Sequence, residues 1–225
     1  MCGRFNVIDN PGLRQLLQDL GIDLKLPAGI NLAPTEDVPL VRRDDAGGDI
    51  AAAHWWLVPS WAKEVNQKYS MFNARSETLG KSPAFRHPFK SQRGLVPMSS
   101  FIEWRPEGGV KQPWLITNEQ QALAVAALWD VWEGGEQPLL SCTLVTTAAA
   151  PEFEPWHARM PVLLAPEEWE RWLDNSRVIA PDDPLFRSEL KMPLRLQPVS
   201  RAVSNSRNKH LDVLQAEGEV IELRG

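Results

Sequence analysis

Cys2 has both the residue type and the position in the chain that could make it a nucleophile. Methionine aminopeptidases remove Met1 when the next residue is small, and removal would leave an α-amine and a thiol on one residue. Their reference pKa values are about 7.7–8.0 and about 8.5, so both groups are partly nucleophilic near neutral pH. Such a 1,2-aminothiol can trap an aldehyde twice, first as a Schiff base and then as a five-membered thiazolidine. The alternative is a small apolar residue near a frayed terminus.

Two other side chains could transfer protons. Glu103 lies in the apolar run Phe101–Trp104, where a carboxylate that faces a core needs a partner or has a raised pKa. A carboxylate on an edge strand that faces water is an equally open interpretation. His157 lies in a predicted loop that leads into an apolar strand, so it is either an acid/base group or a structural histidine.

Three residues could hold parts of a nucleic acid. Asn73 and Arg75 alternate on a predicted short strand, Phe72–Arg75, so their side chains should point to the same face. An amide beside a guanidinium suits a phosphate or a sugar hydroxyl, and it also suits an internal carboxylate. Trp61 follows Val58–Ser60 in a predicted loop, where its indole could stack on a base or belong to the core.

Two helices are predicted around these residues. The first begins after the capping residue Asn10, has its leucines spaced as one helical face over Pro11–Leu20, and stops at Gly21. The second covers Pro166–Leu173, with Trp169, Trp172 and Leu173 on one face.

The remaining apolar runs predict strands bounded by turn residues. They are Val38–Val41, Ile50–Val58, Leu95–Pro97, Phe101–Trp104, Trp114–Thr117, Leu123–Trp129, Leu139–Thr147, Pro161–Leu164 and Leu194–Val199. Glycine-containing turns at 44–48, 106–109 and 133–135 favour hairpins between neighbouring strands. We therefore expect an α+β fold: a single domain over residues 1–225, built on a curved, barrel-like antiparallel sheet with a few flanking helices.

Composition narrows the class of protein. The chain of 225 residues has ordinary apolar and charged fractions of 43% and 24%, which excludes a disordered or coiled-coil chain. No run approaches the roughly 20 apolar residues of a membrane helix. The N-terminus lacks the apolar core of a signal peptide, so we expect a cytoplasmic protein. The two cysteines and four histidines form no metal-ligand spacing, and we expect no metal and no other cofactor.

Charge is unevenly distributed along the chain. The net charge of −5 argues against indiscriminate nucleic-acid binding. Residues 73–95 nevertheless carry Arg75, Lys81, Arg86, Lys90 and Arg93 against Glu77 alone, and residues 200–210 carry Arg201, Arg207 and Lys209 with no acid. Such stretches are typical of phosphate-binding surfaces and also of ordinary solvated faces.

Taken together, eight segments in order along the chain resemble the SOS response-associated peptidase (SRAP) family of abasic-site proteins. They are Met1–Phe5, Asn31–Thr35, Trp55–Ala62, Asn73–Thr78, Ser82–Arg86, Phe101–Trp104, His157–Pro161 and Pro198–Ser200. The chain departs from the family pattern at four places, which are Trp56, Gly94, Ser99–Ser100 and Ala158. None of these departures removes a candidate catalytic group.

The resemblance implies a protein that shields abasic sites in single-stranded DNA through a covalent link to its N-terminal cysteine, and we expect a monomer. Carried over by position, Cys2 supplies the amine and the thiol, and Asn73 holds the opened deoxyribose. Glu103 orients or deprotonates the amine, and His157 is the acid/base for sugar opening. The implied DNA-binding residues are Arg4, Arg75 and Arg159 for phosphates, Trp61 for a base, and Pro34 and Thr147 along the groove.

Two other functions are compatible with the same residues. One is a thiol peptidase in which Cys2 and His157 form a nucleophile–base pair, including a self-processing step that removes Met1. The other is a passive single-strand binder without bond chemistry. Exposure to abasic single-stranded DNA followed by denaturing electrophoresis distinguishes the three.

Overall fold

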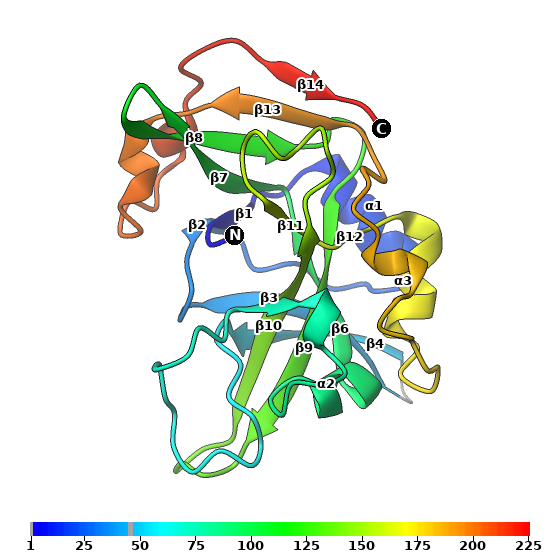
Figure 1. Ribbon diagram of the computed structural model, residues 1–225. Helices are drawn as coiled ribbons and strands as arrows, with labels where there is room; N and C mark the ends of the chain where they lie inside the picture. Colours follow the sequence, from blue (N-terminus) through cyan, green and yellow to red (C-terminus); the bar gives the residue numbers. More distant parts are fainter. Residues whose placement is uncertain (1, 45–46) are drawn as a thin grey trace.

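A computed structural model describes residues 2–44 and 47–225, and two β-sheets form its centre (Figure 1). The strands are β1 (Phe5–Val7), β2 (Gly29–Leu32), β3 (Asp37–Asp44), β4 (Gly47–His54), β5 (Asn73–Arg75), β6 (Arg93–Met98), β7 (Ser100–Glu107), β8 (Val110–Thr117), β9 (Leu123–Trp132), β10 (Leu139–Ala148), β11 (Arg159–Pro161), β12 (Leu163–Leu164), β13 (Leu194–Pro198) and β14 (Ile221–Leu223). The helices are α1 (Pro11–Asp19), α2 (Arg86–Ser91) and α3 (Pro166–Leu173), with short 3₁₀ turns η1 (Ser76–Thr78), η2 (Pro184–Phe186), η3 (Arg201–Ser204) and η4 (Leu211–Leu214).

The larger sheet closes into a ring. Its order is β11-β10-β4-β3-β6-β9-β12, and β9 also pairs with β10, so that β10, β4, β3, β6 and β9 form a closed circuit. The expected barrel-like sheet is therefore confirmed. It is not purely antiparallel, because β10 pairs in parallel with both β4 and β5.

The smaller sheet has the order β14-β13-β8-β7-β1-β2 and packs against the ring. Successive side chains of a strand point to opposite faces. On β7, Phe101 belongs to the main core between the sheets, whereas Ile102 belongs to a second small core with Val199, Val203 and Val213. Glu103 shares the face of Phe101, so it points toward the main core.

Both predicted helices are confirmed. Helix α1 begins where Asn10 Oδ1 accepts the Leu13 N–H, and Gly21 follows it in the left-handed conformation with φ 68°. The hairpins β3–β4, β7–β8 and β9–β10 also form, although the turn residues 45–46 lie outside the described part of the chain. None of the described helices combines the length and the apolar character needed to span a bilayer.

The bounds of the predicted strands shift at one end or both, and in two of them the difference has a clear cause. The strand over Ile50–Val58 ends at His54, because the backbone then turns to Glu36 and Met71, which accept the Trp55 and Leu57 N–H groups. The run Pro161–Leu164 is divided between β11 and β12. Val162 bonds to both β10 and β9 there, so the chain crosses from the edge of β10 to the edge of β9 at this residue.

Candidate functional site

Cys2 lies fully buried at the junction of the two sheets. From the smaller sheet, the Ile102 N–H donates to the Arg4 carbonyl and β1 pairs with β7. From the ring, the Asn73 side chain donates through Nδ2 to the Cys2 carbonyl at 2.9 Å. The backbone of Cys2 is thus fixed from both sides, and Asn73 contacts the nucleophile's own residue.

Glu103 lies near Cys2 on β7 and is only 2% exposed. Burial raises the pKa of Glu103 to about 7. Its carboxylate is close enough to Cys2 to contribute to that residue's raised thiol pKa, after burial, which is the larger cause. The interpretation of Glu103 as an edge carboxylate that faces water is therefore wrong, because its strand turns this side chain to the core.

The thiol of Cys2 differs from the sequence-based expectation. Burial raises its pKa, so near neutral pH the sulfur is a protonated thiol and not a partly ionised one. Its Sγ points to the Arg4 carbonyl at 4.0 Å. A protonated thiol needs a nearby base before its sulfur can act as a nucleophile. Glu103 is the carboxylate whose charge contributes to the raised pKa of the Cys2 thiol.

His157 is brought to the same junction by aromatic packing. Phe153 pairs with Phe101 of β7 at 6.1 Å, and Trp156 pairs edge-on with Trp114 at 5.6 Å. Trp114 stands opposite Glu103 in the β7–β8 register, so the residue before His157 packs against the cross-strand neighbour of Glu103.

The protonation state of His157 follows from its surroundings. Burial lowers the pKa of His157, so the neutral ring dominates near neutral pH. Nδ1 lies 2.9 Å from the backbone nitrogen of Arg159 and 3.1 Å from its carbonyl oxygen, so the backbone of Arg159 holds the ring in place. A neutral ring can accept a proton on its unprotonated nitrogen.

Arg75 and Arg159 lie on opposite sides of β10. Thr146 of β10 pairs with Arg75 on β5, and Ala148 pairs with Arg159 on β11. Arg75 is exposed, and in the described residues it forms no ion pair. Arg159 instead forms an ion pair with Glu77 at 2.6 Å and donates to the Thr146 carbonyl. A phosphate would have to compete with Glu77 for Arg159, but not for Arg75.

Thr147 is buried and Pro34 is half-buried, whereas Arg75 is exposed. The Thr147 hydroxyl donates to the Phe186 carbonyl at 2.6 Å, so it is already engaged. Pro34 lies half-buried in the turn after β2, between Asn31 and Thr35, which both have positive φ angles of 53° and 75°. Arg4 is half-buried, and its guanidinium donates to the Gly3 and Ser204 carbonyls.

Trp61 is 65% exposed in the β4–β5 loop, which we call the Trp61 loop (residues 59–71). The loop borders a cavity of about 650 Å³ that Trp61, Tyr69 and Met71 help to line. Hydrogen bonds fix its base, since the Ser60 N–H donates to Asp130 and the Trp132 indole donates to the Ala62 carbonyl. An exposed indole on an anchored loop is available to stack on a base.

Trp56 and Asp130 support the Trp61 loop. The sequence pattern singled out Trp56 but not Asp130. Trp56 donates through Nε1 to the Asn66 carbonyl, so this departure from the family pattern braces the Trp61 loop. Asp130 was missed, although a lone carboxylate inside the apolar run of β9 is a signal of a buried anchor.

Arg93 does not belong to the basic surface that residues 73–95 suggested. Its side chain is completely buried, and its guanidinium donates to backbone carbonyls near the ends of α2 and α3. The acceptors are Phe89, Lys90, Trp172, Asp174 and Arg177. Arg93 is therefore a structural residue, because carbonyls at the ends of two helices converge on it.

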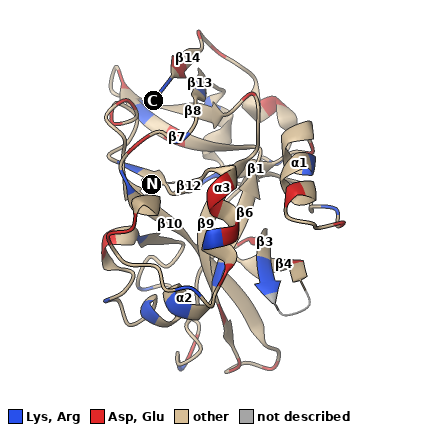
Figure 2. Cartoon of the chain, turned by 90° about the vertical axis from the view of Figure 1, so that its right-hand side faces the viewer, with Lys and Arg blue, Asp and Glu red and all other residues tan. Residues whose placement is uncertain are grey.

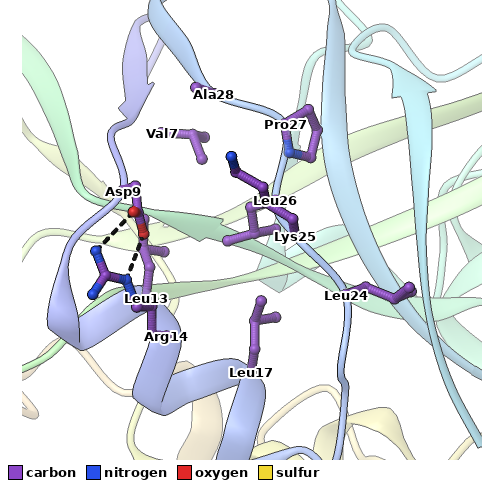
Figure 3. Close-up of a pocket in the computed structure, with 10 residues that line it drawn as sticks. All are labelled: Val7, Asp9, Leu13, Arg14, Leu17, Leu24, Lys25, Leu26, Pro27 and Ala28. Atoms are coloured by element: carbon purple, nitrogen blue, oxygen red, sulfur yellow. Dashed lines mark hydrogen bonds and ion pairs between the residues drawn. The ribbon is translucent and has the colours of Figure 1, made fainter.

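The apolar groove beside α1 is separate from this site. It has a volume of about 660 Å³ and is lined by Leu13, Leu17 and Leu26, with Arg14 bonded to Asp9 at its edge (Figure 3). No candidate site residue lines it. Within residues 2–44 and 47–225, no cluster of three or more potential metal ligands is found.

The fold is a ring-shaped sheet with a second sheet beside it, and the candidate site is a buried cysteine near the N-terminus. The chain belongs to the SOS response associated peptidase (SRAP) family, whose model matches residues 1–206. It is 32% identical to "Abasic site processing protein YoaM" of Bacillus subtilis over 98% of this chain and 100% of that protein. "Abasic site processing protein YedK" of Escherichia coli is 28% identical over 96% of this chain and 99% of that protein. A crystal structure of a Bacteroides thetaiotaomicron protein shares the fold, with a TM-score of 0.79 at 20% identity, over 96% of this chain and 100% of that chain.

Proposed function

We propose that this protein processes abasic sites in single-stranded DNA by forming a covalent adduct through Cys2. The observation that carries the proposal is the junction itself, where Asn73 holds the Cys2 carbonyl and buried Glu103 lies beside the residue. The names of the relatives, which are abasic site processing proteins, support the choice of substrate.

The proposed reaction begins after Met1 has been removed. The free amine of Cys2 attacks the C1 aldehyde of the opened deoxyribose, and the carbinolamine loses water to form an imine. The Cys2 thiol then adds to the imine carbon while its proton passes to the nitrogen, which closes the thiazolidine ring. Glu103, with a pKa of about 7, takes the proton from the Cys2 ammonium before the amine attacks, and burial makes it a stronger base than an exposed carboxylate.

His157 would act on the sugar rather than on the sulfur. The neutral ring can take the proton of the C1 hydroxyl and pass it to the ring oxygen as the sugar opens to the aldehyde. Arg75 would bind a phosphate beside the lesion, and Trp61 would stack on a neighbouring base.

The peptidase alternative fits these surroundings less well. A Cys–His catalytic pair works as thiolate and imidazolium, which requires a lowered thiol pKa. Burial shifts the pKa of Cys2 upward and that of His157 downward, so both groups are neutral.

The test is incubation with an abasic single-stranded oligonucleotide followed by denaturing electrophoresis. We expect a denaturant-resistant band with the natural chain and, without borohydride, none with Cys2→Ala or Cys2→Ser. Cys2→Ala also keeps the amine, so it should behave like Cys2→Ser. Cys2→Ser should give an adduct that borohydride traps and that disappears without it, because imines hydrolyse readily. A complex that salt disperses and denaturant abolishes would instead identify a passive binder. Cys142→Ala, at the other buried cysteine, is the matched control.

A further inference from the structure

A second cationic segment lies outside the site described above. In the 200–210 loop, Arg201 and Arg207 are exposed, and within the described residues neither guanidinium forms an ion pair or a hydrogen bond. Lys209 differs, because it bonds to Glu36 at 2.6 Å. The face shown in Figure 2 has a different pattern, since acidic and basic residues lie side by side along α3.

The 200–210 loop is held in one conformation by a buried asparagine. The Asn31 Nδ2 group donates to the carbonyls of Val203, Asn205 and Asn208, at 3.0, 3.0 and 3.1 Å. Loops fixed in this way lose little conformational entropy when their charges bind a partner. The two arginines are therefore presented on a rigid base.

The same asparagine ties the loop to the strand that follows Cys2. The Asn31 N–H donates to Asn6 Oδ1 at 2.7 Å, and Asn6 Nδ2 donates to the Ser100 hydroxyl at 2.8 Å. Asn6 lies on β1 and Ser100 begins β7, the strand of Glu103. A continuous buried hydrogen-bond chain thus links the loop to both strands that position the site.

Contacts at Ser204 place the loop beside the site. The Trp104 indole donates to the Ser204 hydroxyl at 3.0 Å, and Arg4 donates to the Ser204 carbonyl at 3.5 Å. Trp104 follows Glu103, and Arg4 is two residues from Cys2. In Figure 1 the loop, in orange, and the Trp61 loop, in cyan, extend on the same side of the molecule with β2 between them.

We propose that Arg201 and Arg207 bind phosphates of the DNA strand on one side of the abasic site, while the Trp61 loop receives the strand on the other side. The inference rests on the proposed function and adds a second arm to its binding surface. Exposed arginines without acidic partners suit phosphate oxygens, which carry no base information. Binding through this arm is therefore independent of sequence and sensitive to salt.

The test compares Arg201→Ala/Arg207→Ala with Arg14→Ala/Arg224→Ala, which removes the same charge. Arg14 lies on α1 and Arg224 beside the C-terminus, both on the right in Figure 1, whereas the 200–210 loop is on the left. Affinity is measured for an abasic oligonucleotide of about 4 nucleotides and for oligonucleotides of about 16 extended only 5′ or only 3′ of the lesion. We expect Arg201→Ala/Arg207→Ala to bind one of the two extended oligonucleotides roughly tenfold more weakly than the natural chain does, and to bind the other one normally. For that one oligonucleotide, the slope of log affinity against log salt should be smaller by about 1.4, because each lost single-strand contact removes about 0.7. The control pair should change neither.

Three results would overturn this proposal: an equal loss of affinity for both extended oligonucleotides, a loss of affinity for the short oligonucleotide, or no loss of affinity for any of them. Adduct formation on the short oligonucleotide is recorded in parallel. If the natural chain forms no adduct while the one-sided loss is still seen, the proposed chemistry fails and the second arm stands. If the adduct forms normally and no one-sided loss is seen, only the second arm fails.

Discussion

The buried junction around Cys2 and the exposed rim around Arg75 and Trp61 follow different physical rules. At the junction, removal from water shifts the pKa of Cys2 and Glu103 upward and that of His157 downward. At the rim, charged and aromatic side chains face solvent. Salt at 0.1 M screens the interactions of exposed charges over a distance of about 10 Å. Chemistry at the junction should therefore depend on pH, and binding at the rim on ionic strength.

The largest effect should come from the junction. We expect His157→Ala to slow adduct formation by roughly 10²–10⁴-fold, because it removes a positioned acid/base group. Affinity for undamaged single-stranded DNA, measured by fluorescence anisotropy, should stay close to that of the natural chain. His87→Ala, an exposed histidine on α2, is the control. A parallel loss of affinity and rate would mean that His157 only supports its loop.

Arg93 and Arg75 belong to the same basic stretch of the sequence, but Arg93 is buried and Arg75 is exposed. Arg93→Ala should lower the free energy of unfolding by about 3–5 kcal/mol, because it leaves buried carbonyls without donors. Arg75→Ala removes the same charge from an exposed position and should change stability by less than about 0.5 kcal/mol. Urea unfolding of both variants makes the comparison. Similar midpoints would show that Arg93 is not a structural anchor.

Glu103→Gln tests whether the junction is as dry as its burial indicates. The pKa of Glu103 lies at about 7 in the fold against an ordinary value of 4.5, so between these values the folded state retains a proton that the unfolded state has released. Stability of the natural chain should thus fall as pH rises through this range, by about 3 kcal/mol in all, and glutamine should abolish that fall. The difference between the two chains in urea unfolding should grow from about pH 4 to about pH 8 and then stay constant. A difference that does not vary with pH would contradict the raised pKa.

The smallest effect belongs to the rim. Arg75→Ala should weaken binding to single strands of any sequence and reduce the slope of log affinity against log salt by about 0.7. The rate of adduct formation at saturating DNA should be unchanged, since Arg75 is exposed and would bind only a phosphate. Arg224→Ala is the control, at an exposed arginine paired with Glu222. An unchanged slope would assign Arg75 to a role within the protein.

The elements that local signals specify were predictable from the sequence. Helix α3 has the predicted bounds, and α1 ends within a residue of its prediction, because capping residues and leucine spacing act within a few residues. The closure of the ring depends on pairing between β9 and β10 together with single bridges from β10 to β4 and from β3 to β6. The turn residues predicted the first of these pairings, whereas nothing local encodes the bridges.

The candidate site was predictable in its residues but not in its electrostatics. Motif positions identified Cys2, Asn73, Glu103 and His157, and the fold brings them to one junction. The sequence predicted the pKa of an exposed thiol for Cys2, because nothing near position 2 of the chain indicates that this residue is buried between two sheets. Arg159 and Arg93 looked alike in the sequence, since neither the Glu77 pair nor the converging carbonyls lie nearby in the chain.

The central claim is that both the amine and the thiol of Cys2 bond to the abasic sugar. It is tested most directly by mass spectrometry of the N-terminal peptide after reaction with an abasic oligonucleotide, with Met1 removed and with Met1 retained. We predict an adduct on Cys2, formed with loss of one water, that survives denaturation only in the chain without Met1. An equally stable adduct on the chain that retains Met1 would contradict the thiazolidine, because its amine lies one residue too far away to close the ring.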